Sequence, residues 1–120
     1  MEECIFCKIA SGKIPSKIVY KDKDILGFKN VEPEAPLHLL FIPKRHLEWK
    51  DKLNEKNSSI FGKLILSAKK TAIKYKIFPA CKLIFNIGKT GHISHIHLHL
   101  IGGWREKIPM ANVSKIKKWL

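Results

Sequence analysis

The sequence lacks a long hydrophobic stretch. No apolar run approaches the ~18 residues of a membrane-spanning helix, and no signal peptide is recognisable at the start. We therefore expect a cytoplasmic protein with no membrane partner. Internal repeats, linkers and low-complexity segments are also missing, so the 120 residues are expected to form a single domain, 1–120, large enough to bury a core.

Acidic residues are few: the chain has 10 Asp and Glu and 23 Lys and Arg, which gives a net charge of +13. Such an excess favours anionic partners, such as nucleotides or nucleic acids. The lysines are spread along the whole chain, however, and form neither a compact basic block nor part of a zinc-finger repeat. A dedicated nucleic-acid site is therefore not expected.

Cysteine is scarce as well, with three in the chain. Cys4 and Cys7 form a C-x-x-C pair, which in a cytosolic protein indicates metal or redox chemistry rather than a structural disulfide. A thioredoxin-like role needs a βαβ context, which does not surround this pair. Because there is no second C-x-x-C, a zinc site here would need histidines as its other two ligands. Cys81 lies in an apolar run and is expected to be a buried core thiol.

What the sequence does contain is an alternation of histidine and aliphatic residues over 95–101. A period of two predicts a strand with His95, His97 and His99 on one face and the aliphatic residues on the other. The residues alone leave three interpretations: a half-solvated strand, one zinc ion held by all three imidazoles, or covalent catalysis on a phosphate. In the last, one imidazole attacks and the others hold the anion and the leaving group.

The remaining apolar patterns predict the other elements. A short helix near the start ends at Gly12, and a long amphipathic helix covers about 55–76 with Asn54 as its cap. The predicted strands are 18–20 and 25–28, joined as a hairpin, followed by 37–43 and 83–85. His38 lies inside the predicted strand 37–43 and is interpreted as a core or surface histidine with satisfied hydrogen bonds, rather than as a ligand.

Together these residues resemble the histidine triad family, in its branch of small nucleotide-binding proteins and purine nucleoside phosphoramidases. The family signature, His-x-His-x-His followed by two apolar residues, is complete at 95–101, and the resemblance covers about residues 4–104. The glycine pair Gly102-Gly103 resembles the phosphoramidase branch more than the dinucleoside polyphosphate hydrolase branch. The other matching pieces are Ile5-Phe6, Ile14-Pro15, Ala35-Pro36, Ile42-Pro43-Lys44-Arg45-His46 and Asn86.

The resemblance implies an α+β fold and a role for several positions. The fold is an antiparallel five-stranded sheet with one long helix across it and a short N-terminal helix, and two such sheets join in a homodimer. His97 matches the nucleophile that attacks the α-phosphorus, and His99 matches the residue that contacts the α-phosphate and the leaving group. Asn86 lies where the family places a phosphate-side asparagine. The implied nucleoside contacts are Phe6, Ile9, Ile14 and Phe28 around the base, and Asn30 and Val31 at the ribose.

Three departures from the family pattern concern the substrate. The ribose position is usually Asp, and Asn30 gives up its charge-assisted hydrogen bond. The loop before the signature is shorter than usual, so the usual Ser/Thr phosphate contact falls on His92, which either donates to phosphate or points into solvent. The tail after Gly103 lacks the usual Trp-Pro-Pro run, so substrate contacts from that run do not carry over.

The cysteines also match a known variation of the family. Some members carry a structural zinc ion on an N-terminal C-x-x-C, the histidine after the Pro-Lys strand end, and the first triad histidine. The matching residues here are Cys4, Cys7, His46 and His95. The first triad histidine would then be structural, and the other two would be left for chemistry. No organic cofactor is expected.

The function that the resemblance implies is hydrolysis of a purine nucleoside phosphoramidate, or a related adenylate, through a nucleotidyl-histidine intermediate. The alternatives are a dinucleoside polyphosphate hydrolase and a non-catalytic nucleotide-binding regulatory protein that retains the pocket. A basic RNA-binding module is a third class and would show salt-sensitive binding to RNA. The expected partners are therefore a purine nucleotide and a second copy of the chain.

Overall fold

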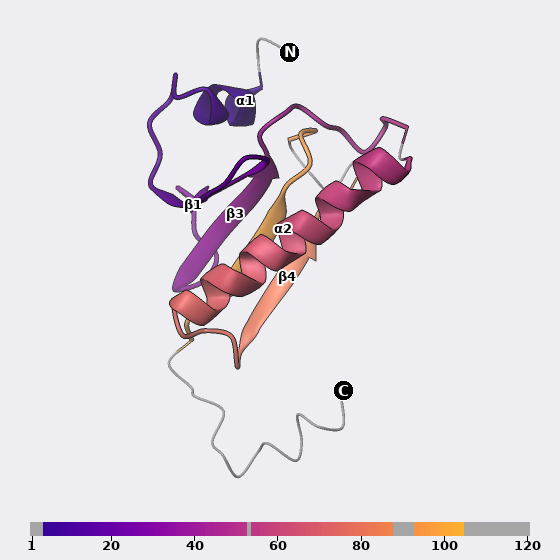
Figure 1. The fold of residues 1–120 in the computed structure, drawn as a ribbon. Helices are drawn as coiled ribbons and strands as arrows, with labels where there is room; N and C mark the ends of the chain where they lie inside the picture. Colours follow the sequence, from indigo (N-terminus) through magenta and orange to yellow (C-terminus); the bar gives the residue numbers. More distant parts are fainter. Residues whose placement is uncertain (1–3, 53, 88–92, 105–120) are drawn as a thin grey trace.

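The computed structural model describes residues 4–52, 54–87 and 93–104 (Figure 1). It confirms the predicted α+β fold, in which a five-stranded antiparallel sheet has the strand order β1-β2-β3-β5-β4. None of the helices in these described residues is both long and apolar enough to cross a membrane. The elements are α1 (Ile5–Ala10), β1 (Ile18–Lys21), β2 (Ile25–Lys29), β3 (Leu37–Pro43), α2 (Glu55–Lys74), β4 (Cys81–Phe85) and β5 (Leu98–Gly102).

The long helix α2 begins where its capping residue predicts. The Asn54 side chain accepts a hydrogen bond from the Asn57 backbone N–H at 3.0 Å, and so satisfies one of the free donors of the first turn. The helix ends at Lys74, slightly before the predicted end at residue 76. Lys76 has a φ of 61°, a left-handed conformation that turns the chain out of the helix toward β4.

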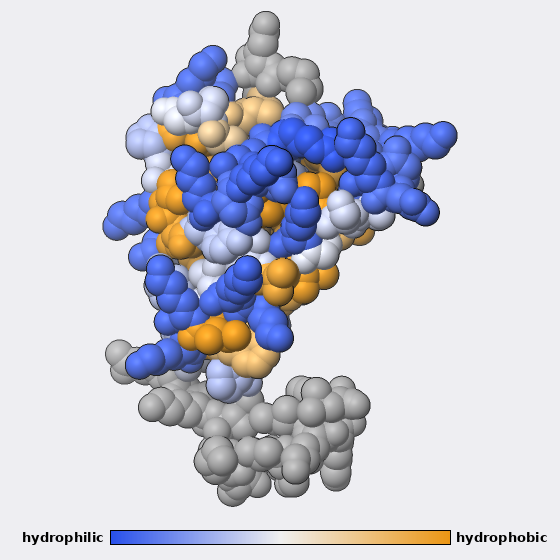
Figure 2. Space-filling model, in the orientation of Figure 1, coloured by the Kyte–Doolittle hydropathy of each residue, from blue (hydrophilic) through white to orange (hydrophobic). Residues whose placement is uncertain are grey.

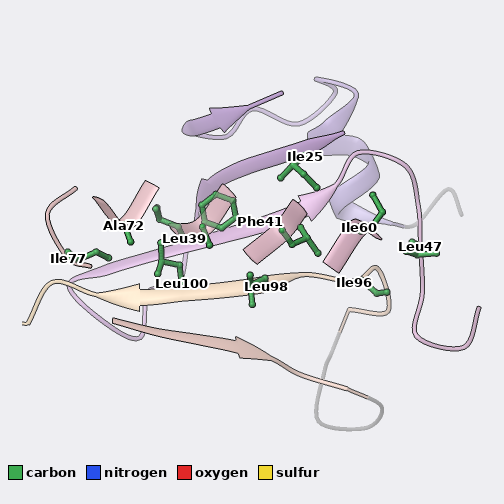
Figure 3. Packing of buried hydrophobic residues seen from close by; sticks show 12 residues of the cluster. Ile25, Leu39, Phe41, Leu47, Ile60, Ala72, Ile77, Ile96, Leu98 and Leu100 are labelled. Atoms are coloured by element: carbon green, nitrogen blue, oxygen red, sulfur yellow. The ribbon is translucent and has the colours of Figure 1, made fainter. Parts of the chain in front are cut away.

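The two faces of the sheet carry separate hydrophobic clusters. On one face, α2 packs through residues such as Ile60 and Ala72 onto inward residues of the central strands, such as Leu39 and Leu100 (Figures 1 and 3). On the other face, Phe6 of α1 packs against a second set of strand residues, Leu26, Phe28, Leu40 and Ile42. Strand β3 contributes to both clusters, so its nearly continuous apolar sequence is explained by burial on both faces, as predicted.

The histidine strand is shorter than predicted. Regular pairing begins at Leu98, whereas His95 makes only an isolated bridge with Glu48. The reason lies in the neighbouring strand: Pro43 has no N–H to offer the ladder, and its carbonyl accepts from the His95 ring instead, at 2.9 Å. The alternation of faces survives, because Ile96 and Leu98 join the α2-side cluster.

The edge strand β4 also differs from its prediction. It begins at Cys81 rather than Leu83, and the Cys81 thiol is half-buried rather than buried in the core. An edge strand has a neighbour on one side only, so its side chains keep more contact with solvent. Leu83 and Ile84 remain 42% and 38% exposed.

Two glycines give a matched test of this packing. A Cβ on Gly27 would lie 2.6 Å from Cε2 of Phe41, a fully buried core ring, whereas a Cβ on Gly62 of α2 would meet nothing within 4 Å. We expect Gly27→Ala to lower the free energy of unfolding by about 1–3 kcal/mol. Gly62→Ala should raise it by about 0.5–1 kcal/mol, because alanine is the better helix former. Urea denaturation measures both, and equal effects of the two substitutions would contradict the packing.

Candidate functional site

Four side chains with metal-binding atoms converge from distant parts of the chain. Cys4 and Cys7 come from the cap and body of α1, His46 follows β3, and His95 precedes β5. Their ligand atoms all lie within 4.8 Å of one another. The Nδ1 of His95 is 3.4 Å from the Cys4 sulfur and 3.6 Å from the Cys7 sulfur, and the Nδ1 of His46 is 3.2 Å from the Cys7 sulfur. A tetrahedral zinc site holds sulfur and nitrogen ligands roughly 3.5 Å apart, so these four residues fit one.

The two histidines of this Cys–His cluster are held in the tautomer that a metal requires. The Nε2–H of His46 donates to the Glu48 carboxylate at 2.7 Å, and the Nε2–H of His95 donates to the Pro43 carbonyl at 2.9 Å. Each ring therefore keeps the lone pair of its Nδ1 directed at the sulfurs. Glu48 is a residue that the sequence did not indicate, because nothing local shows that it faces His46.

The two thiols also favour a cation between them. Burial and the neighbouring Cys4 thiol raise the pKa of Cys7 to about 11. Two adjacent thiolates repel each other, and a divalent cation removes this penalty by stabilising both in the ionised form. The donor set, its spacing and its electrostatics therefore agree on a closed metal site.

The second triad histidine, His97, keeps one ring nitrogen unprotonated. The Nδ1–H of His97 donates to the backbone carbonyl of His95 at 2.8 Å, which leaves the lone pair on Nε2. The side chain is 6% exposed, and its ring packs edge-on against Phe6 with 5.1 Å between the centroids. His97 is thus fixed in orientation and can attack an electrophile without first losing a proton.

The third triad histidine belongs to a hydrogen-bonded chain. The Glu34 backbone N–H donates to Nδ1 of His38 at 3.0 Å, so the proton of the neutral His38 ring lies on Nε2. That Nε2–H donates to Nδ1 of His99 at 2.8 Å. His99 therefore carries its own proton on Nε2, which is 3.1 Å from the Asn86 side-chain nitrogen. In this tautomer the Asn86 amide must be flipped, so that its oxygen accepts this proton. His99 is oriented as a proton donor, next to His97.

Burial keeps these imidazoles neutral. Desolvation, together with the smaller effects of the neighbouring His97 and His38, lowers the pKa of His99 to about 4. Desolvation also lowers the pKa of His97, although its hydrogen bond to the His95 carbonyl acts in the opposite direction. Desolvation lowers the pKa of His38 as well, although the nearby Glu34 carboxylate acts to raise it. At neutral pH the centre therefore holds uncharged rings, one with a free lone pair and one with a proton to give.

The comparisons with known proteins agree with this arrangement. A family model described as "Scavenger mRNA decapping enzyme C-term binding" matches residues 3–112. An HIT-like protein of Buchnera aphidicola is 42% identical over 102 residues, which are 82% of this chain and 91% of that protein. This chain belongs to the histidine triad (HIT) family. A 14 kDa zinc-binding protein of Brassica juncea is 38% identical over 105 residues, which are 84% of this chain and 93% of that protein. The crystal structure of an HIT family hydrolase from Legionella pneumophila has a TM-score of 0.80 at 39% identity, with 89% of this chain and 98% of that chain covered.

The residues predicted to contact the nucleobase differ in how deeply they are buried. Phe6 and Phe28 are almost fully buried, with ring centroids 5.6 Å apart, so they lie beneath the surface of the site and do not form its exposed sides. Ile9 of α1 packs against the hydrophobic cluster that contains these two rings and is half-buried, as is Ile93, which the sequence analysis did not select. Ile14 is also half-buried but lies outside this cluster.

The predicted ribose and phosphate residues are placed as follows. Asn30 is half-buried, and its side-chain nitrogen lies 3.4 Å from Nε2 of His38. Val31 is 90% exposed. Asn86 contacts His99, and its predicted phosphate contact stays a prediction, whereas His92 lies outside the described residues.

His38 is the functional residue that the sequence interpretation missed. It is buried and hydrogen-bonded, as expected, but its partner is His99. The contact arises because β3 and β5 are neighbours in the sheet and both side chains face the α1 side. Strand pairing between segments 61 residues apart leaves no local mark in the sequence.

The lowered pKa of His99 predicts a pH-dependent stability. The unfolded imidazole has an ordinary pKa of 6.5, and the folded one has a pKa of about 4. Above pH 6.5 both states are neutral and the contribution of His99 is fully present. As the pH falls, the unfolded chain takes up the proton first, so this contribution is lost between about pH 6.5 and pH 4.

We expect His99→Gln to reduce the fall in unfolding free energy over that pH range, relative to the wild type. Urea denaturation at pH 7.5, 6.5, 5.5 and 4.5 measures it. Parallel pH profiles of the two proteins would show that His99 is not held neutral by the fold.

Proposed function

We propose that this histidine triad protein hydrolyses purine nucleoside phosphoramidates, or related adenylates, through a covalent nucleotidyl-His97 intermediate. The observation that carries the proposal is the fixed tautomer of His97, whose Nδ1–H is committed to the His95 carbonyl and whose Nε2 lone pair is free. The hydrolase named among the solved relatives supports the reaction class. The glycine pair that ends β5 supports the phosphoramidate substrate, by the resemblance to that branch of the family.

The reaction has two displacements at the same phosphorus. Nε2 of His97 attacks the α-phosphorus, a P–N bond to the imidazole forms, and the P–N bond to the leaving group breaks. The departing nitrogen takes the proton from Nε2 of His99. The hydrogen bond that His38 Nε2–H donates to Nδ1 of His99 stabilises the His99 ring as it loses this proton. Water then attacks the phosphorus, gives a proton to Nε2 of His99 and releases the nucleoside monophosphate, so that both His97 and His99 are regenerated. Asn86 steadies the phosphate oxygens beside His99.

Turnover of a fluorogenic adenosine phosphoramidate tests the proposal. We expect His97→Ala to abolish turnover and to leave nucleotide binding largely intact, because the base and ribose contacts lie elsewhere. Rapid quench of wild-type protein with labelled substrate should trap one nucleotide on His97. His99→Ala should lower the rate by about 10²–10⁴-fold, the usual contribution of a positioned acid. Near-normal turnover by His97→Ala would overturn the mechanism, and binding without turnover in the wild type would favour the regulatory alternative.

We propose that the metal of the Cys–His cluster is a structural zinc ion. The support is the fit of the four ligands to tetrahedral geometry and the relative named as a zinc-binding protein. Such an ion would fasten α1 to the triad strand, and so hold Phe6 against the His97 ring. Zinc-bound thiolates also suit the cytoplasm, where free cysteines stay reduced.

The three cysteines allow a controlled test of the zinc assignment. Protein prepared without chelator should contain about one zinc per chain. Cys4→Ser and Cys7→Ser should each lower both the zinc content and the melting temperature, because structural zinc contributes directly to folding. Cys81→Ser is the matched control and should keep the zinc, since its thiol lies in β4 away from the cluster. Metal-free protein with unchanged stability would refute the assignment.

We propose that two copies associate through β4 and the adjoining side of α2. A groove of about 230 Å³ between them is lined by apolar groups, among them Phe78 and Leu83, which are 50% and 42% exposed. Apolar patches over α2 and β4 also interrupt the hydrophilic surface in Figure 2. An edge strand with free backbone groups and exposed aliphatic side chains favours pairing with its own copy across a twofold axis.

Sedimentation at micromolar concentration should show a dimer of the 13.8 kDa chain. Leu83→Glu should convert it to a monomer, because it places a charge at the edge that pairs. Val31→Glu is the control and should stay dimeric, since Val31 is exposed on a different part of the molecule. A wild type that is monomeric at these concentrations would overturn the proposal.

A further inference from the structure

A cleft of about 670 Å³ opens at the outer end of the β1–β2 pair. Its lining is mixed, with more apolar than polar surface, and it includes two lysines and no acidic residue. Lys17 precedes β1, and Lys29 ends β2, so the two ammonium groups belong to adjacent backbone segments. The lining residues are Pro15, Ser16, Lys17, Lys29, Asn30, Val31 and Pro33.

The two lysines face each other across the sheet. Ile18 pairs with Phe28, and the Lys29 N–H donates to the Lys17 carbonyl at 3.0 Å, so these lysines occupy opposed positions of the ladder. Like charges in this relation destabilise a sheet. Among the described residues, neither ammonium has a carboxylate within 4.0 Å. The fold therefore keeps an uncompensated pair of cations at the mouth of the cleft.

The cleft is connected to the reacting centre through Asn30. The Asn30 side chain lines the cleft and lies 3.4 Å from Nε2 of His38, the atom that donates to His99. Its side-chain oxygen accepts from the Glu32 backbone N–H at 2.9 Å, which fixes the amide. The nearby acidic residues, Glu32 and Glu34, follow in the same loop but do not line the cleft. The two lysines are therefore the charged residues of the cleft lining.

We propose that this cleft binds a phosphate monoester carried on the 2′ or 3′ oxygen of the substrate's ribose. The inference rests on the proposed function, which puts the ribose at Asn30 and the α-phosphate at His97. A phosphate monoester carries about −1.5 to −2 charges at neutral pH and is attracted by two nearby ammonium groups. An aspartate at position 30 would repel that charge at close range, whereas the amide of Asn30 does not. The substrates are then purine nucleotides phosphorylated on the ribose as well as at the 5′ position.

Calorimetric titration of the full-length wild-type protein with three product nucleotides tests the inference. The probes are AMP, adenosine 3′,5′-bisphosphate and adenosine 2′,5′-bisphosphate, none of which carries a bond for the enzyme to cleave by the proposed reaction. We expect one bisphosphate to bind about tenfold more tightly than AMP at low ionic strength, a difference of about 1.4 kcal/mol. The gap should shrink in 0.5 M salt, because exposed charges are screened.

Two variants locate the effect. Lys17→Gln combined with Lys29→Gln should bring the affinities for AMP and the bisphosphate together. Lys56→Gln combined with Lys70→Gln removes the same charge from exposed positions of α2 and should keep the gap. Asn30→Asp should reverse the preference, because the carboxylate repels the ribose phosphate and can accept hydrogen bonds from a free diol.

The outcomes separate this inference from the proposed function. If AMP itself does not bind, the proposed function is wrong and the inference falls with it. If AMP binds at least as tightly as both bisphosphates, the inference alone is wrong. A gap that survives in the Lys17/Lys29 double variant would place the second phosphate outside the cleft and also overturn it.

Discussion

The site depends on the position of His95, which connects three parts of the molecule at once. Its Nδ1 faces the two cysteines of the α1 segment, its Nε2–H is donated to the end of β3, and its backbone carbonyl accepts the proton of the His97 ring. Because the residue has no exposed surface, none of these bonds competes with water. The tautomer of the proposed nucleophile is thus set by a residue that does no chemistry itself.

Desolvation is the second physical effect on which the chemistry depends. Imidazoles in water would be partly protonated near neutrality, and a protonated ring is no nucleophile. Here burial lowers the pKa of both His97 and His99, so both rings are neutral, and backbone contacts then decide where each proton lies. One backbone carbonyl places the His97 proton on Nδ1, and one backbone N–H, acting through His38, places the His99 proton on Nε2. Two identical side chains thus hold their protons on different ring nitrogens.

The reacting centre lies between two different surroundings. On the Asn86 side, a small pocket of about 170 Å³ is bounded by Trp49 and Glu48. On the Asn30 side, the larger cleft carries the unpaired lysines. A nucleotide bound as proposed, with its α-phosphate at His97, would have its phosphate near the first and its ribose near the second.

Much of the fold and the list of site residues followed from the sequence by itself. Periodicity placed both helices and most strands, and Asn54 capped α2 as predicted, because these features depend on near neighbours in the chain. The family pattern selected Cys4, Cys7, His46 and His95, which the fold does bring together. Only the tertiary structure decided how those residues act: that β5 starts at Leu98, that His38 donates to His99, and that Glu48 orients His46. The first two depend on contacts between distant segments, whereas Glu48 lies two residues from His46 and reaches it through the local turn of the chain. Side-chain type alone fixes neither the partner of a histidine nor which of its nitrogens holds the proton.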